Sequence, residues 1–179
     1  MTLHADATAT LHAWRPPTPE QESLRQAYLS YLDARADACE RACAPGHLTA
    51  SALVLDSTER QVLLTLHPRV GRWLQLGGHC EPSDVSLRAA ALREATEESG
   101  MDGLRIEPEP VHLDVHPVTC SLGVPTRHLD VRFVVRAPAG AQPVRSDESD
   151  DLRWWPIDAL PEGSDDLLPL IAASNSQYV

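Results

Sequence analysis

The sequence predicts an α/β fold in which helices lie on both sides of a mixed sheet, with a helical extension at the N-terminus. Its 179 residues fit one domain plus a short extension, and 42% of them are hydrophobic, which is enough for a core. Helix-type and strand-type segments follow in the order helix, strands, helix, strands, helix. Because the strands come in groups joined by hairpin-like turns, a mixed sheet is favoured over a doubly wound βαβ repeat.

The extension, residues 1–46, is expected to contain one helix. Thr18 to Gln21 has the pattern of a capping box, with Pro19 at the first helical position. Apolar residues then recur at helical spacing until Pro45-Gly46 ends the pattern. They are Leu24, Tyr28, Tyr31, Leu32, Cys39 and Ala42. This apolar stripe should pack either on the main domain, residues 47–179, or on a second copy of the chain in a homodimer.

The main domain should begin with short strands. Residues 48–56 and 61–67 are apolar runs of the β type, and the polar turn between them predicts a hairpin. Trp73 to Leu76 reads as a further short strand, which Gly77-Gly78 should end.

A helix and a second group of strands follow. Ser86 to Ser99 has helical spacing, and the next glycine should cap its end. Val111 to Val118 and Arg127 to Val135 alternate apolar and polar residues, which predicts an antiparallel pair. A strand at Leu152 to Trp155 and a helix at Asp165 to Ala172 should complete the domain.

Charge and composition exclude several classes of function. All fifteen positive residues are arginine, so chemistry that needs a lysine amine is ruled out, including Schiff-base catalysis. The net charge of −11 argues against partners such as nucleic acid or an anionic membrane surface. No apolar run approaches the ~20 residues of a membrane span, and the N-terminus does not read as a secretion signal. The expected location is therefore the cytoplasm, with the four cysteines reduced.

The segment that carries chemistry is the acidic helix. Glu94, Glu97 and Glu98 stand at i, i+3 and i+4 and so share one helix face. Like charges at this spacing destabilise a bare helix, and Arg93 can pair only with part of them, at i+4 with Glu97. For three glutamates alone, a solvated acidic face would be the preferred interpretation. If a cation is bound, oxygen ligands of this kind suit Mg²⁺ or Mn²⁺ better than Zn²⁺.

The longer segment from Gly77 to Met101 resembles the Nudix hydrolase family, whose signature reads GX5EX7REUXEEXGU, where U is a bulky apolar residue. The residues that match are Gly78, Arg93, Glu94, Glu97, Glu98, Gly100 and Met101. Asp84 stands where the first glutamate is expected, and eight residues instead of seven separate it from Arg93. Beyond this segment, the order of elements from about His47 to Ala172 is also similar to that of the family.

The resemblance implies an α/β/α sandwich and a metal-dependent hydrolase with Mg²⁺ or Mn²⁺ as cofactor. The expected substrate has a diphosphate linkage between a nucleoside and another moiety, as in ADP-ribose or a nucleotide sugar. By the same resemblance, the backbone at Gly78 with Glu94 and Glu98 would ligate the metal, Glu97 would ligate it or act as base, and Arg93 would orient a glutamate. The alternatives are a hydrolase of nucleoside triphosphates, an isoprenyl-diphosphate isomerase, or a catalytically silent module that senses a nucleotide.

A further acidic residue outside this segment often completes the metal site or serves as base in the family. Glu148, six residues before Trp154, is the candidate, and Asp150 and Asp151 compete with it. The alternative is a solvated acidic loop, because the surrounding segment is rich in charge.

Substrate-binding candidates lie on the two long alternating strands and in the glycine loop. One strand face is polar, and its residues are His112, Asp114, His116, His128, Asp130 and Arg132. This face either lines the substrate or is a hydrated outer surface. If it lines the substrate, Arg132 is the expected phosphate or carboxylate contact, beside His128 and Asp130, because its planar fork binds such groups in a bidentate manner. His79 in the loop is a second candidate for a phosphate contact.

Cys39, Cys43 and His47 have a spacing that could suggest zinc. Only three candidate ligands occur there, and Cys39 belongs to the apolar stripe, so small buried hydrophobic residues are the favoured interpretation.

Overall fold

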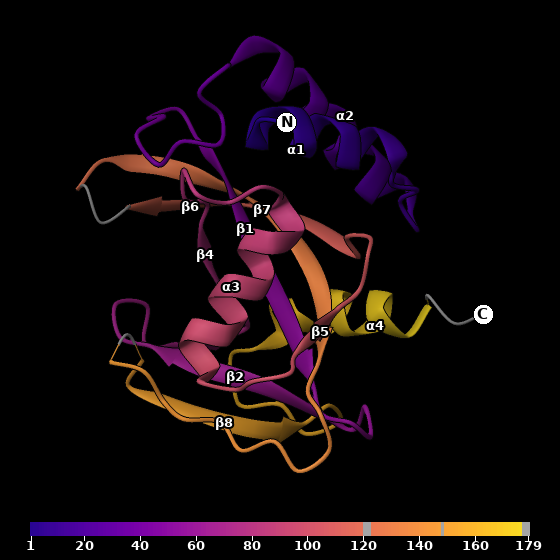
Figure 1. The fold of residues 1–179 in the computed structure, drawn as a ribbon, viewed down its shortest axis with the longest axis vertical. Helices are drawn as coiled ribbons and strands as arrows, with labels where there is room; N and C mark the ends of the chain where they lie inside the picture. The colour runs from indigo at the N-terminus through magenta and orange to yellow at the C-terminus, as the bar shows by residue number, and fades with distance from the viewer. Residues whose placement is uncertain (120–122, 148, 177–179) are drawn as a thin grey trace.

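The computed structural model describes residues 1–119, 123–147 and 149–176. Within these residues eight strands form one sheet, with helices on both of its faces (Figure 1). The strands are β1 (His47–Leu55), β2 (Gln61–His67), β3 (Arg72–Leu74), β4 (Leu76–His79), β5 (Arg105–Ile106), β6 (His112–Thr119), β7 (Pro125–Arg136) and β8 (Asp151–Pro156). The helices are α1 (Leu3–Ala13), α2 (Pro19–Ala34), α3 (Leu87–Ser99), α4 (Leu168–Ser176) and the short 3₁₀ helix η1 (Asp165–Leu167). The predicted α/β/α sandwich with a mixed sheet is confirmed.

Strand β1 is the centre of the sheet, and all nine of its residues are buried. It pairs in parallel with β7 and antiparallel with β2 and β4. The parallel register sets His47 beside His128 and Thr49 beside Asp130. Since side chains alternate along a strand, the polar residues of β1 and β7 point to the same face of the sheet.

The core consists of three clusters of buried side chains, two of them on the face of the sheet that α3 covers and one on the opposite face. On one face, α1, α2 and the first turns of α3 pack against apolar side chains of β1, β6 and β7. On the other face, α4 packs against β1 and β2, with Trp73 and Trp155 in edge-to-face contact at 5.3 Å between ring centroids. Both tryptophans are half-buried and pack against the core. No helix in the described part of the chain is long and apolar enough to cross a membrane.

The N-terminal extension holds two helices, so the expectation of one helix was wrong. Helix α1 lacks an apolar period, because short alanine and threonine side chains make up most of it. It is held instead by the Thr2 cap, by the complete burial of Ala7 and Leu11, and by the His4 ring, which lies 3.0 Å from the Leu32 carbonyl of α2. Such tertiary contacts leave no regular pattern in the sequence.

Helix α2 begins as predicted, with Thr18 as its cap and Pro19 in its first turn, but it ends at Ala34. Arg35 adopts an extended backbone and pairs with Asp37, so the chain turns there. Cys39 therefore lies in a turn and not on the helix. The apolar face of α2 packs on its own domain, with Tyr28 and Leu32 buried, which is one of the two arrangements that the sequence left open.

The two glycines do not end a strand, as the sequence suggested, but lie within β4. This strand pairs with β1, and Gly77 lies opposite Ser51. A Cβ on Gly77 would come within 2.5 Å of the Ser51 hydroxyl, and the φ of Gly77 is +150°. Glycine is thus needed for β4 to run this close to β1. The other predicted strands and helices are present, and β5 is a short addition that the sequence did not indicate.

Candidate active site

Helix α3 presents a charged face to a cavity. The Ser86 hydroxyl accepts a hydrogen bond from the N–H of Ala89 and caps the first turn, and Gly100, with a φ of 61°, ends the helix. The inner face consists of small and apolar side chains that are fully buried, namely Leu87, Ala90, Ala91 and Ala95. The helical period therefore turns the charged side chains of the same helix outward, and those that line the cavity are Arg93, Glu94, Glu97 and Glu98.

Arg93 ties the preceding loop to this face. Its guanidinium donates two hydrogen bonds to Asp84, of 3.1 and 3.0 Å, and one of 3.0 Å to the carbonyl of His79. It also donates bonds of 3.0 Å to Glu94 and to Glu97, the latter at the predicted i, i+4 spacing. Hydrogen bonding to Asp84, together with the nearby glutamate charge, raises the pKa of Arg93 above its usual range.

Asp84 is the position at which this chain departs from the Nudix signature. Its carboxylate is buried, accepts bonds from both Nε and Nη2 along one edge of the Arg93 guanidinium, and accepts a further bond of 2.7 Å from the N–H of Glu81. The shorter side chain and the extra loop residue are therefore compatible with a closed junction between the loop and α3.

Two carboxylates of α3 lie against Gly77 and Gly78 of strand β4. The Gly77 N–H donates a bond of 3.1 Å to Glu98. A Cβ on Gly78 would come within 2.8 Å of the Glu94 carboxyl group, so only glycine permits this close approach. The Glu94 side chain is 12% exposed. We call Gly77, Gly78, Glu94 and Glu98 the acidic turn. Its donor atoms are carboxylate and backbone oxygens, which fit a Mg²⁺ or Mn²⁺ ion.

The other predicted acidic residues lie differently. Glu97 contacts Arg93, but its side chain is 60% exposed, so it lies at the outer rim of the acidic turn. Glu148 lies outside the described residues. Asp150 and Asp151 are not among the described residues that line the cavity.

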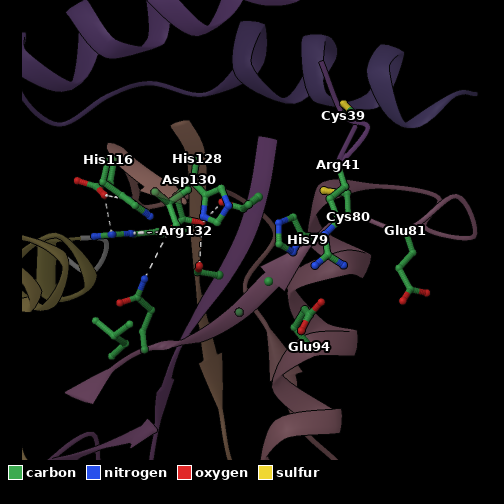
Figure 2. Close-up of a pocket in the computed structure, with 18 of the residues that line it drawn as sticks. Cys39, Arg41, His79, Cys80, Glu81, Glu94, His116, His128, Asp130 and Arg132 are labelled. Atoms are coloured by element: carbon green, nitrogen blue, oxygen red, sulfur yellow. Dashed lines mark hydrogen bonds and ion pairs between the residues drawn. The ribbon is translucent and has the colours of Figure 1, made fainter. Parts of the chain in front are cut away.

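The cavity beside the acidic turn has a volume of about 1820 Å³. One wall is the acidic turn, and another is the polar face of β6 and β7, where five of the six predicted residues line the cavity. The sixth, His112, is not in this lining, and its ring lies 3.2 Å from the Gln21 side chain of α2. Figure 2 shows Glu94 on one side of His79 and the group around Asp130 on the other. The N-terminal extension closes part of the rim through Thr2, Leu3, His4 and Arg41.

Asp130 and Arg132 form a buried ion pair in the wall of this cavity. Asp130 is 2% exposed and accepts bonds from Thr49 and Ser51 of β1, at 2.9 and 2.7 Å. Arg132 binds Asp130 at 2.8 Å and Asp114 at 3.0 Å. Two carboxylates thus already balance the guanidinium that was expected to bind phosphate. In this arrangement Arg132 holds the wall together.

His79 and His128 lie next to each other, with ring centroids 5.0 Å apart. Burial lowers the pKa of His79 to about 3 and that of His128 to about 4, and the nearby Arg41 guanidinium acts in the same direction. Both rings are therefore neutral at pH 7, so they offer a substrate hydrogen bonds but no positive charge.

Strand β1 contributes Thr49 and Ser51 to the site, and neither residue was predicted from the sequence. Thr49 and Ser51 line the cavity and His47 lies on the same face of β1, but the sequence of β1 is typical of an apolar core strand. These polar residues occur at every second position of β1, and this alternation could have predicted that they share one face of the sheet. The parallel pairing of β1 with β7, which brings them to Asp130, joins segments some 80 residues apart and has no local signature.

Comparisons with known proteins agree with this architecture. Solved structures that resemble this chain include a Nudix-family hydrolase from Clostridium perfringens, with 20% identity, a TM-score of 0.53, and coverage of 74% of this chain and 98% of that chain. The MutT protein from Methanosarcina mazei Go1 has 19% identity and a TM-score of 0.57, over 74% of this chain and 97% of that one. A UDP-X diphosphatase has 18% identity and a TM-score of 0.54, over 97% of this chain and 91% of its own. At these low sequence identities, the structural similarity shows a shared fold and nothing further.

The comparison with curated proteins gave no match. A family model described as NUDIX domain matches residues 45–173, which include the acidic turn, Asp84 and Arg93. Since this match spans most of the sequence, the chain belongs to the Nudix family.

Proposed function

We propose that this protein is a metal-dependent hydrolase that cleaves the diphosphate linkage of a nucleoside diphosphate joined to another moiety. Membership of the Nudix family supports the enzyme class, a pyrophosphohydrolase. The observation that carries the proposal is the acidic turn, fixed by Arg93 and Asp84, at one wall of a cavity of about 1820 Å³.

We propose that Glu94, Glu98 and the backbone of Gly78 hold Mg²⁺ or Mn²⁺. When bound, such a cation supplies positive charge to the diphosphate and lowers the pKa of a bound water. The chain has no lysine, and Arg93, the arginine at the acidic turn, is already paired with three carboxylates, so a cation is the favoured partner for the diphosphate at this place. Arg93 orients Glu94 through their 3.0 Å hydrogen bond.

Glu97 and Glu148 are the proposed acid–base residues. Glu97 lies at the rim of the acidic turn, where its exposed carboxylate can receive a proton from a water and pass it to solvent. Glu148 is proposed from its place in the sequence alone. If either residue is the general base, its change to glutamine should lower kcat by about 100-fold or more, with a smaller effect on KM.

The size and lining of the cavity support a substrate with two parts. Its volume of about 1820 Å³ exceeds the roughly 300–1000 Å³ that is typical of pockets for a single small ligand. The diphosphate would lie at the acidic turn, and the remaining parts along the β6–β7 wall and the N-terminal rim. The UDP-X diphosphatase, whose match extends over the N-terminal helices as well, supports UDP-linked compounds beside ADP-ribose as candidates.

A substrate panel tests this proposal. ADP-ribose, UDP-sugars and other nucleotide sugars, dinucleoside polyphosphates and nucleoside triphosphates are incubated with the protein and Mg²⁺ or Mn²⁺, and the release of nucleoside monophosphate or phosphate is measured. We expect turnover of the diphosphate-linked compounds, its loss in Glu98→Gln, and wild-type rates in Glu109→Gln, which changes an exposed carboxylate outside the cavity lining. Binding of a nucleotide without turnover would instead favour a sensing module.

A further inference from the structure

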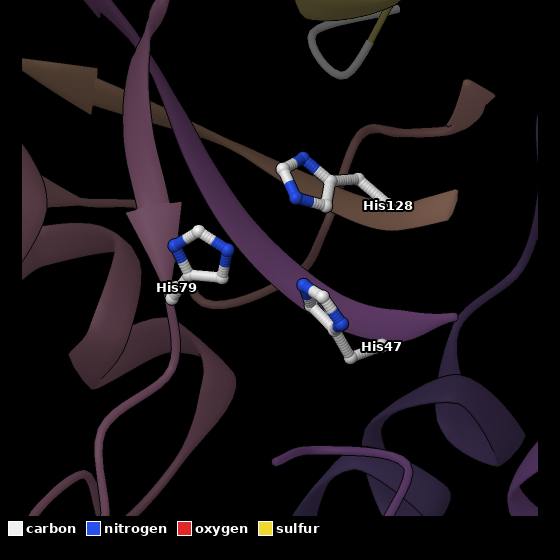
Figure 3. A group of neighbouring side chains, drawn as sticks. All are labelled: His47, His79 and His128. Carbon is white, nitrogen blue, oxygen red and sulfur yellow. The ribbon is translucent and has the colours of Figure 1, made fainter. Parts of the chain in front are cut away.

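Three histidines converge beside the acidic turn, in a part of the site that the proposed reaction does not use. They are His47 of β1, His79 of β4 and His128 of β7, and their rings surround one small space (Figure 3). One nitrogen of each ring lies within 4.8 Å of the others. The ring centroids are 5.0 to 5.1 Å apart. We call these three residues the histidine cluster.

Sheet pairing fixes this arrangement. His47 and His128 are direct neighbours in the parallel pairing of β1 with β7. His79 lies on the other side of β1, opposite Thr49, so its side chain is on the same face as that of His47, two residues away. The three histidines therefore belong to three paired strands of the sheet, β1, β4 and β7, and none of them lies in a loop.

Two ring nitrogens in the cluster have no protein partner. His47 is 1% exposed, its Nδ1 lies 3.3 Å from the Cys43 carbonyl, and its Nε2 is buried without a hydrogen bond. Nε2 of His128 is likewise buried and unpartnered. Buried polar atoms without partners are rare and costly, and each calls for an explanation such as a bound ion. Two such atoms in one group of imidazoles point to a shared ligand.

We propose that the histidine cluster is a second metal site, for a Zn²⁺-type cation. Nitrogen ligands suit zinc and related transition metals, whereas the oxygen ligands of the acidic turn suit Mg²⁺. Three imidazoles fill three tetrahedral positions, and the fourth stays open toward the cavity for a water or an oxygen of a bound molecule. Zn–N bonds of about 2.0–2.1 Å set the nitrogens roughly 3.4 Å apart, so small rotations of the rings would close the present spacing.

The charges around the cluster are compatible with a cation. Burial lowers the pKa of all three histidines, so they are in the neutral form that ligates metals. The buried carboxylate of Asp130 favours positive charge at His128, whereas Arg41 opposes it. Because Arg41 is exposed, water screens its charge more than that of Asp130. Cys39 and Cys43, whose spacing with His47 could suggest zinc, are not part of the cluster, and the Cys43 sulfur lies 3.3 Å from the Tyr31 hydroxyl.

Zinc retention tests the proposal. The full chain is stripped with a chelator, loaded with ZnCl₂ in the presence of excess Mg²⁺, passed through a desalting column, and its zinc content measured. We expect one zinc per chain in the wild type and less than about a tenth of that in His79→Gln and in His128→Gln, because two imidazoles bind too weakly to survive the column. Both positions are only half-buried, so these variants should fold, and circular dichroism checks this.

Two controls make the result specific. His112→Gln changes another half-buried histidine with an unpartnered nitrogen, on β6 outside the cluster, and should retain zinc. The double variant Glu94→Gln, Glu98→Gln removes both carboxylates of the acidic turn and should also retain zinc. Cobalt in place of zinc should give the visible absorption of a tetrahedral Co²⁺ site in the wild type and not in His128→Gln. A wild type without retained zinc, or cluster variants that keep it, would overturn the proposal.

Discussion

Arg93 connects three parts of the site, because its guanidinium binds Asp84 in the loop, the His79 carbonyl of β4 and two glutamates of its own helix. The i, i+3, i+4 spacing of the glutamates predicted that they share one helix face, because this spacing depends only on the local helical period. The sequence could not show that Asp84 reaches Arg93 across a longer loop, because loop closure depends on backbone geometry and not on spacing alone.

Asp84 should contribute to activity although it does not belong to the acidic turn. Asp84→Asn weakens the hold on Arg93, which then orients Glu94 less well. We expect kcat to fall by about 10- to 100-fold, as is typical when a residue that supports a metal ligand is changed. Asp84→Glu should keep more activity, since it restores the charge. Steady-state kinetics on the substrate found in the panel would show this, and equal kcat values for Asp84→Asn and the wild type would contradict it.

Gly78 should tolerate no side chain, because a Cβ there would come within 2.8 Å of the Glu94 carboxyl group. Gly78→Ala must displace Glu94, and we expect Mn²⁺ affinity to fall by about 10-fold or more, a loss of at least ~1.4 kcal/mol. Titration of the metal-free protein with Mn²⁺, followed by electron paramagnetic resonance, measures this. Gly140→Ala is the control, since it also introduces a methyl group but lies away from the cavity. Unchanged Mn²⁺ affinity in Gly78→Ala would refute the packing argument.

At the scale of elements, predictions succeeded where a segment carries its own pattern. Helix α3 has a cap, an apolar face and a terminal glycine, and β6 and β7 alternate clearly, so their positions could be predicted. Helix α1 and the strand path through Gly77-Gly78 could not, because contacts with distant elements define them. The early end of α2 has the same cause, since the Arg35–Asp37 pair and the return of the chain to β1 decide it.

Helix α2 should stabilise the cavity wall through Tyr28. The buried hydroxyl of Tyr28 donates to the carbonyl oxygens of Asp114 and Asp130, at 2.6 and 3.1 Å, where β6 and β7 pair. Tyr28→Phe removes the donor and leaves buried acceptors, which should cost about 1 to 2 kcal/mol of unfolding free energy. Urea denaturation measures the change. A loss below about 0.3 kcal/mol would mean that the extension does not hold this wall through Tyr28.

For the whole molecule, the buried histidines should make stability depend on pH. Folding lowers the pKa of His79 to about 3 and of His128 to about 4, mainly through burial, from an ordinary value near 6.5. At a pH between the folded and the unfolded pKa, the unfolded chain binds more protons than the folded chain. The free energy of unfolding must therefore fall as the pH falls from about 6.5 toward 4. His116 acts oppositely, because its bond to Asp114 raises its pKa, and the stability it adds is lost as the pH rises through that raised pKa.

This pH effect can be measured by urea denaturation of the metal-free protein between pH 7 and pH 4.5. For each buried neutral histidine the slope should approach about 1.4 kcal/mol per pH unit below pH 6. The slope should be smaller in His128→Gln than in the wild type. Stability that stays constant or increases on acidification would contradict the burial of these rings.

The most direct test of the account is the dependence of hydrolysis on Mg²⁺ at the acidic turn. Metal-free protein is given a nucleotide sugar, Mg²⁺ is added stepwise, and the release of nucleoside monophosphate is followed for the wild type and for the double variant Glu94→Gln, Glu98→Gln. We expect no release without Mg²⁺, a rate that rises to saturation in the wild type, and a rate at least about 100-fold lower in the double variant. Release without a divalent cation, or equal rates in the two proteins, would contradict it.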